Sequence, residues 1–133
     1  MKAVSAKITR GLNLGSLVDV ADNSGAKMVR IVAVKRGKGR KGRQLACGLA
    51  DLVKVDVKEG SKELKKQVFW AVVVRQRRPF RRLTGERIFF ESNAVVLLKD
   101  ETGNPKGTQV KTAIAREAAE RWPFVAKISS IIV

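Results

Sequence analysis

Residues 68–75 read VFWAVVVR, and this stretch decides the fold class. It contains six consecutive apolar residues, Phe69 to Val74, and three of them are β-branched valines. The run is too short for a typical helix and is rich in residues that favour strands. It therefore predicts a central β-strand that is buried on both faces.

Similar short runs lie on both sides of this strand. Residues 53–57 alternate apolar and charged side chains, as expected for a strand with one face in water. Turn signals occur at Asp22–Gly25 and at Thr84-Gly85. Strands are predicted at Leu17–Val20, Lys27–Val34, Leu52–Val57, Val68–Arg75, Arg87–Phe90 and Val95–Leu98. Many short strands in a chain of this length favour a small closed barrel over a sandwich.

The C-terminal part differs in texture. Residues 113–121 (AIAREAAER) predict a helix, with Thr112 as its N-cap and Pro123 beyond its end. The apolar tail, Ile128–Val133, is expected to pack back on the domain. The 133 residues contain no repeat and no low-complexity linker, so we expect one domain over 1–133 with a C-terminal helical segment from about residue 112 to 133.

Charge indicates the class of partner. Lys and Arg number 28 against 12 Asp and Glu, a formal charge of +16. Nucleic acid is the common partner of so basic a chain, because binding releases counterions condensed on the phosphates. A membrane surface is a weaker alternative, since neither a basic amphipathic helix nor an apolar run of about 20 residues is visible. The N-terminus lacks the apolar run of a signal peptide, and the lone Cys47 fits a reducing cytoplasm.

The residues that are missing weaken the case for an enzyme. The chain has no His, and therefore no general base of the usual kind near neutral pH. With no His and one Cys, it also cannot assemble a zinc site of ordinary ligand type. Serine, lysine or carboxylate chemistry remains possible in principle. We expect no enzyme activity, no metal, no cofactor and no small-molecule substrate.

The first charge cluster is the basic loop, residues 35–43 (KRGKGRKGR), which holds six cations and no acid. Its cations are Lys35, Arg36, Lys38, Arg40, Lys41 and Arg43. The interspersed glycines allow the main chain to approach a ligand closely, which suits a phosphate backbone. The alternative is a solvated loop that serves solubility. We favour RNA because acids would serve solubility equally well and none occurs.

The second cluster is the arginine segment, residues 75–82 (RQRRPFRR), which directly follows the most apolar strand. Its cations are Arg75, Arg77, Arg78, Arg81 and Arg82. Arginine forks favour bidentate phosphate contacts and stacking on bases. Phe80 is either a core residue, the commoner case beside a strand end, or a stacking platform for a base. Further cations are scattered near the C-terminal helix, and we expect half of them to be ordinary surface charge. One of them, Lys106, completes the set of predicted RNA contacts.

Several segments resemble a known family, the universal ribosomal large-subunit protein fourteen. The most specific match is Ala71–Val74, then a basic spacer, Gly85, Phe90, Asn93 and Val96-Leu97, in the order and spacing of the family. Residues 21–26 (ADNSGA), 105–108 (PKGT) and 115–117 (ARE) also look like family segments. Residues before Gly15 resemble the archaeal and eukaryotic branch. The chain departs from the family pattern at Thr84, at Ala50-Asp51 and at Thr112-Ala113.

The resemblance implies a five-stranded antiparallel barrel followed by short helices. It also implies a cytoplasmic, ribosome-bound protein that contacts large-subunit rRNA and bridges to small-subunit rRNA. Implied protein neighbours are ribosomal protein three, ribosomal protein twenty-four of archaeal and eukaryotic type, and the anti-association initiation factor six. A free RNA- or DNA-binding barrel is the alternative. Aromatic residues are only 5% of the chain, with no Tyr, which disfavours a barrel that stacks many bases.

Overall fold

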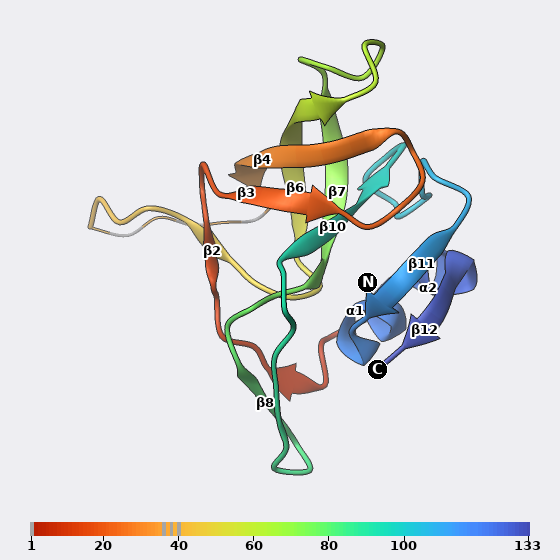
Figure 1. Cartoon of the computed structure of the whole chain (residues 1–133). Helices are drawn as coiled ribbons and strands as arrows, with labels where there is room; N and C mark the ends of the chain where they lie inside the picture. The colour runs from red at the N-terminus through yellow and green to blue at the C-terminus, as the bar shows by residue number, and fades with distance from the viewer. Residues whose placement is uncertain (1, 36, 38, 40) are drawn as a thin grey trace.

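The computed structural model describes residues 2–35, 37, 39 and 41–133. Its centre is a closed barrel of five strands in the order β10-β3-β4-β6-β7 (Figure 1). The bounds of these strands are Leu17–Val20 for β3, Ala26–Val34 for β4, Leu52–Gly60 for β6, Val68–Arg75 for β7 and Ala94–Leu98 for β10. The predicted barrel is therefore confirmed, and β3 and β7 have the predicted bounds.

The barrel is mixed rather than wholly antiparallel. Four of its pairings are antiparallel, but β10 and β3 run parallel, with Ala94 opposite Asp19 and Val95 opposite Val20. The expectation of an antiparallel barrel is corrected at this seam. The reason is parity: strand directions cannot alternate all the way around a ring with an odd number of members, so one pair must be parallel.

Strand β7 is buried on both faces from Ala71 to Val74, as predicted, whereas Val68 is exposed and Phe69 and Trp70 are half-buried. Ala71 and Val73 point into the barrel, where they pack with valines and Ile31 of neighbouring strands. Val72 and Val74 point outward into a second core, and all four residues from Ala71 to Val74 are fully buried. The same alternation divides β10 between the two cores. A single strand thus supports two apolar layers.

The second core is covered by the C-terminal segment, which lies beside the barrel in Figure 1. This segment consists of β11 (Val110–Ile114), α1 (Arg116–Arg121), α2 (Pro123–Ile128) and β12 (Ser129–Ile132). The Trp122 ring is buried there, and its indole N–H donates to the carbonyl oxygen of Ala50 at 2.9 Å. Gly103 lies directly beneath this ring, because a Cβ at that position would meet it at 2.9 Å.

The predicted helix from Ala113 to Arg121 is wrong at its start. Residues 113 and 114 belong to β11, which pairs in parallel with β12 through Ala113↔Ile131 and Ile114↔Ile132. Pairing with the β-branched tail overrides the helix propensity of these two residues. Helix α1 accordingly begins after Ala115, which makes no side-chain cap, and Thr112 is not the N-cap. The helix does end before Pro123, as predicted, but this proline also begins α2, where its missing N–H costs nothing.

Two small sheets lie outside the barrel. One joins β1 (Ala6–Lys7), β8 (Phe80–Arg82) and β9 (Arg87–Ile88), and the other joins β2 (Leu12–Asn13) to β5 (Ala46–Cys47). Strands β8 and β9 form a hairpin that projects at the bottom of Figure 1. Gly85 turns this hairpin with a φ of 92°, a conformation that glycine adopts without strain. In the described residues no helix is long and apolar enough to cross a bilayer.

Candidate nucleic-acid interface

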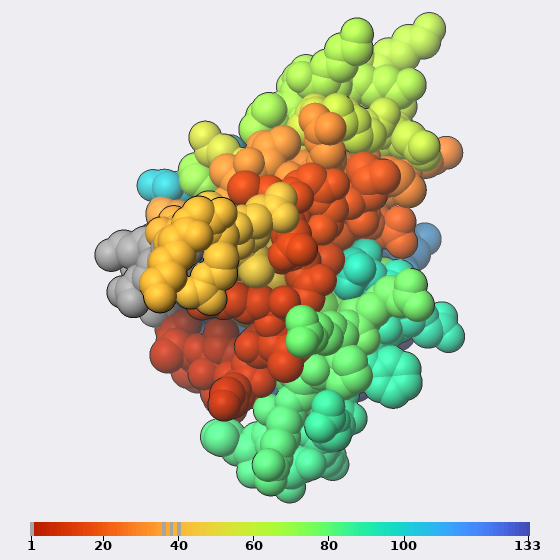
Figure 2. Space-filling view, turned by 90° about the vertical axis from the view of Figure 1, so that its left-hand side faces the viewer, coloured from red at the N-terminus to blue at the C-terminus, as the bar shows by residue number. Residues whose placement is uncertain are grey.

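Three segments far apart in the sequence lie on one face of the molecule. Figure 2 shows the loop that follows β4, the N-terminal segment and the β8–β9 hairpin next to one another on this face. Arg10 and Arg43 line the same shallow groove, and Lys7, Arg81 and Arg87 line another. The N-terminal segment therefore connects the basic loop to the arginine segment. We call this face, residues 7–10, 41–45 and 77–87, the basic surface.

Among the described residues of the basic loop, Lys41 and Arg43 contribute to the basic surface. Lys41 and Arg43 are exposed. Lys35, at the base of the loop, is occupied instead by an ion pair of 2.8 Å with Glu101, and its ammonium lies 5.9 Å from the centre of the Trp70 ring. The predicted contacts Arg36, Lys38 and Arg40 lie outside the described residues.

The arginine segment divides into exposed and buried members. Arg77, Arg78 and Arg81 are exposed. Arg75 is half-buried, and its Nη1 donates to the carbonyl oxygen of Ala113 at 3.4 Å. Burial lowers the pKa of this guanidinium, although the nearby Asp19 carboxylate acts in the opposite direction. Arg75 therefore links the end of β7 to β11.

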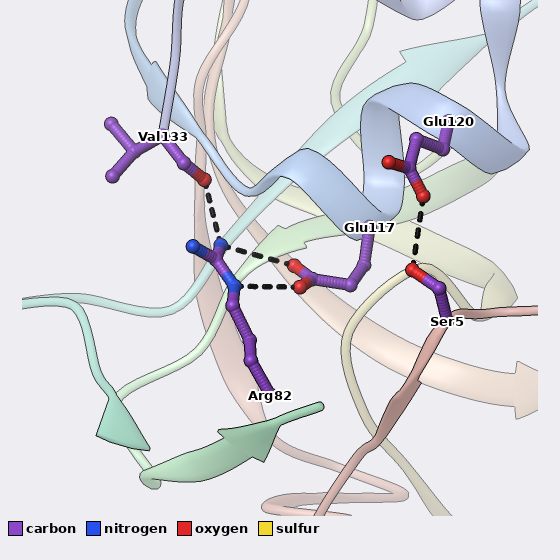
Figure 3. Close-up of polar contacts among 5 residues, drawn as sticks. All are labelled: Ser5, Arg82, Glu117, Glu120 and Val133. Atoms are coloured by element: carbon purple, nitrogen blue, oxygen red, sulfur yellow. Dashed lines mark hydrogen bonds and ion pairs between the residues drawn. The ribbon is translucent and has the colours of Figure 1, made fainter. Parts of the chain in front are cut away.

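Arg82 lies in a buried ion pair (Figure 3). Its Nε donates to the Glu117 carboxylate of α1 at 2.7 Å, and its Nη2 donates to the other oxygen at 3.3 Å and to the carbonyl oxygen of Val133 at 2.7 Å. The side chains of Arg82 and Glu117 are only 9% and 3% exposed. These contacts leave little of the guanidinium for a phosphate and attach the hairpin to the C-terminal segment.

Lys106 lies away from the basic surface. Its ammonium is 5.0 Å from the centre of the Phe69 ring, at the beginning of β7, whereas the arginine segment begins at Arg75, where β7 ends. Phe69 and Arg75 are six positions apart along the strand, a distance of roughly 20 Å. Lys106 therefore belongs to a different part of the barrel.

Sequence reasoning missed three exposed cations of the basic surface, Lys7, Arg10 and Arg87. The available signal was weak: residues 2–10 contain three cations and no acid, but they are spread out. Their placement depends on the pairing of β1 with β8, in which Lys7 lies opposite Arg81. The guanidinium of Arg78 also reaches the carbonyl oxygen of Arg10, at 3.5 Å.

Gln76 was also missed, and it holds the basic surface together. Arginines precede and follow Gln76 in the sequence, but the Gln76 side chain itself is fully buried. Its Nε2 donates to the carbonyl oxygens of Thr9 and Arg78, at 3.0 and 2.9 Å, and lies 3.2 Å from the Thr9 hydroxyl. Its Oε1 accepts from the N–H of Leu49 at 3.0 Å. One amide thus links the N-terminal segment, the arginine segment and the turn after β5.

The exposed cations of the basic surface form no ion pair with an acid in the part of the chain that the structure describes. Ion pairs among the described residues involve Arg30, Lys35, Lys58, Arg82 and Arg121 as the cations. The basic surface instead carries eight unpaired ones: Lys7, Arg10, Lys41, Arg43, Arg77, Arg78, Arg81 and Arg87. Cations gathered in this way raise the local potential and favour a polyanion.

Two further residues of the sequence analysis are buried. Phe80 is 1% exposed and packs with Leu49 and Ala115, so it is a core residue and offers no ring face to a base. Cys47 is fully buried, and desolvation, with Asp51 as the next cause, raises the pKa of its thiol to about 12. Such a thiol is protonated at neutral pH and is a packed core residue rather than a nucleophile.

Comparison with known proteins gives consistent matches. Residues 11–133 match the family model described as ribosomal protein L14p/L23e. Proteins named large ribosomal subunit protein uL14 match over the full 133 residues, which is 100% of each chain. The protein from Nanoarchaeum equitans is 56% identical, that from Halobacterium salinarum 47% and that from Methanothrix thermoacetophila 45%.

Proposed function

The chain belongs to the ribosomal protein L14p/L23e family, and from this premise we propose that it binds large-subunit rRNA through its basic surface. Its ribosomal role is structural and not enzymatic, as in the family. The residues before Gly15 predict the archaeal and eukaryotic branch of the family, and the archaeal relatives agree with this prediction. We infer that residues 1–133 act as one rRNA-binding domain of the ribosome-bound protein.

The observation that carries the proposal is the set of eight exposed, unpaired cations on one face. A free protein gains nothing from placing like charges together, since they repel one another. RNA phosphates compensate this repulsion and supply acceptors for the arginine forks. Phosphate contacts position a protein without reading base identity, which suits a structural component.

The scaffold beneath these cations supports the same role. Gln76 and the Arg82–Glu117 pair fix the N-terminal segment and the hairpin before RNA arrives. A surface that is already ordered loses less conformational entropy on binding. The basic surface therefore acts as a rigid support at a junction of rRNA segments.

The test compares two triple variants with equal loss of charge. In the first, Arg10, Arg43 and Arg78 of the basic surface are replaced by Gln. In the second, the control, Lys62, Lys65 and Lys66 are replaced by Gln; these exposed lysines lie in the turn between β6 and β7. Affinity for large-subunit rRNA fragments is measured against salt concentration.

Each lost phosphate contact flattens the slope of log K against log salt by about 0.7 to 0.9. We expect the first variant to flatten the slope by about 2 to 3 and the control to leave it nearly unchanged. Equal slopes for the two variants would show that total charge, and not the basic surface, determines RNA binding.

The family membership also leads us to propose a place at the contact between the two subunits, with small-subunit rRNA as a second partner. Ribosomal protein three, ribosomal protein twenty-four of archaeal and eukaryotic type and the anti-association initiation factor six are its proposed protein neighbours. Cross-linking of assembled ribosomes followed by mass spectrometry tests each of these neighbours.

A further inference from the structure

A groove of about 580 Å³ lies between the N-terminal segment and the β8–β9 hairpin. Residues 7–9 form one side, and residues 79–83 with Arg87 form the other. Its size falls within the roughly 300–1,000 Å³ of pockets that hold small ligands. The hairpin that forms one of these sides projects away from the barrel at the bottom of Figure 1.

The two sides of the groove are fixed to each other. Main-chain pairing joins β1 to β8 through Ala6↔Arg82 and Lys7↔Arg81. The hydroxyl of Thr9 donates to the carbonyl oxygen of Pro79 at 2.7 Å, and Gln76 holds Thr9 from below. The groove is therefore formed in advance of any ligand, which lowers the entropic cost of binding.

The chemistry of the groove combines an apolar surface with cations. Leu83 is 86% exposed at the tip of the hairpin, and half-buried Ile8 and Pro79 lie along the groove. Lys7, Arg81 and Arg87 are exposed around it and form no ion pair with another described residue. The described residues that line the groove include no acid.

This combination matches one ligand class. A base has an apolar face, and its phosphate carries the negative charge, so a nucleotide presents both features within one small unit. Duplex RNA would engage the cations but would keep its base faces stacked inside the helix. We propose that the groove receives one unpaired nucleotide of rRNA, with the base against Pro79 and Leu83 and a phosphate held by Lys7, Arg81 and Arg87. This inference rests on the proposed function, which places rRNA on the same face.

One side of the groove precedes the part of the chain that the family model matches. The family model matches residues 11–133, whereas Lys7, Ile8 and Thr9 lie before the match begins. The side of the groove formed by β1 therefore comes from residues outside the family match, while the full-length archaeal relatives cover them.

The test uses Leu83→Ser, which removes the exposed apolar side chain and leaves every charge in place. The matched control is Val68→Ser, another exposed apolar residue, which lies at the start of β7. Each protein is bound to large-subunit rRNA, and the reactivity of every nucleotide is read by chemical probing. The salt dependence of binding is measured in parallel.

We expect Leu83→Ser to raise the reactivity of one unpaired nucleotide and to weaken binding about five- to tenfold, the low end of the value of one stacked base. The salt slope should not change, because no phosphate contact is lost. The double variant Lys7→Gln with Arg87→Gln should expose the same nucleotide and flatten the slope. Val68→Ser should do neither.

Two results would overturn the inference: no nucleotide changes its reactivity in Leu83→Ser, or the nucleotides that change are base-paired. In each case salt-dependent binding through Arg10, Arg43 and Arg78 could persist. The groove would then have failed while the proposed function stood. Loss of the salt dependence in the native chain would refute the proposed function instead.

Discussion

Replacement of Gln76 by methionine tests whether one buried amide holds the basic surface together. Methionine is a linear side chain of similar volume, so the exchange removes the polar atoms and leaves no large cavity. It deprives the N–H of Leu49 of its acceptor and the carbonyl oxygens of Thr9 and Arg78 of a donor.

The magnitude follows from the burial of these groups. Leu49 is 1% exposed, so its N–H has no access to water and should cost about 1–3 kcal/mol when unpaired. The two carbonyl oxygens belong to half-buried Thr9 and exposed Arg78 and should add a smaller amount. A total of about 3 kcal/mol, at about 2.1 cal/mol/K of unfolding entropy for each of 133 residues, lowers the Tm by about 11 °C.

The assay is thermal unfolding followed by circular dichroism, with Gln109→Met as the control. Gln109 is exposed, and the hydrogen bond that Asn23 accepts from it comes from its main-chain N–H, so the exchange buries no unpaired group. We expect the Tm of Gln109→Met to stay within about 2 °C of the native chain, as for surface substitutions. A Gln76→Met variant as stable as the control would refute the reasoning.

Two further predictions concern other buried groups. Glu117→Gln leaves the charge of Arg82 buried without its carboxylate and should destabilise the fold by about 3 kcal/mol. The assay is urea unfolding, and the control is Glu120→Gln, an exposed residue of the same helix. Equal urea midpoints for the two variants would contradict the role given to the Arg82–Glu117 pair. Burial raises the pKa of Cys47 to about 12 from 9.0, so the folded chain keeps a proton that the unfolded chain releases above pH 9. The stability tied to this thiol is present below pH 9 and is lost as the pH rises toward 12. Relative to Cys47→Ala, the native chain should lose roughly 2 kcal/mol between pH 9 and 11, and parallel pH curves would contradict the shift.

The barrel could be predicted because its signal is local. The apolar run at Phe69–Val74 and the alternation at Val53–Val57 each specify a strand without reference to any other part of the chain. The start of α1 could not be predicted in this way. Ala113 and Ile114 have local helix propensity, and their strand conformation comes from pairing with residues 131 and 132.

The sequence predicts which segments of the chain are basic, but not which of their cations are exposed on the basic surface. The two basic clusters identify segments of the chain, yet Arg82 is distinguished from Arg81 by its contacts with Glu117 and Val133. Lys7 and Arg10 join the basic surface only because β1 pairs with β8 and Thr9 meets Gln76. Such assignments depend on contacts between residues that lie 35 positions apart, as for Arg82 and Glu117, or 67 apart, as for Thr9 and Gln76. Periodicity and charge counts do not reveal such contacts.

The parallel seam of the barrel has a consequence for the chain while it is being synthesised. Strand β3 can pair with β4 early, but its other edge must wait for β10, whose Ala94 lies 75 residues after Asp19. Until then the nascent chain presents an open strand edge beside a strongly positive surface, and open edges invite pairing with other chains. The nascent chain is therefore prone to aggregation until β10 pairs with β3. A factor that covers the open edge of β3 during this interval would increase the yield of folded protein.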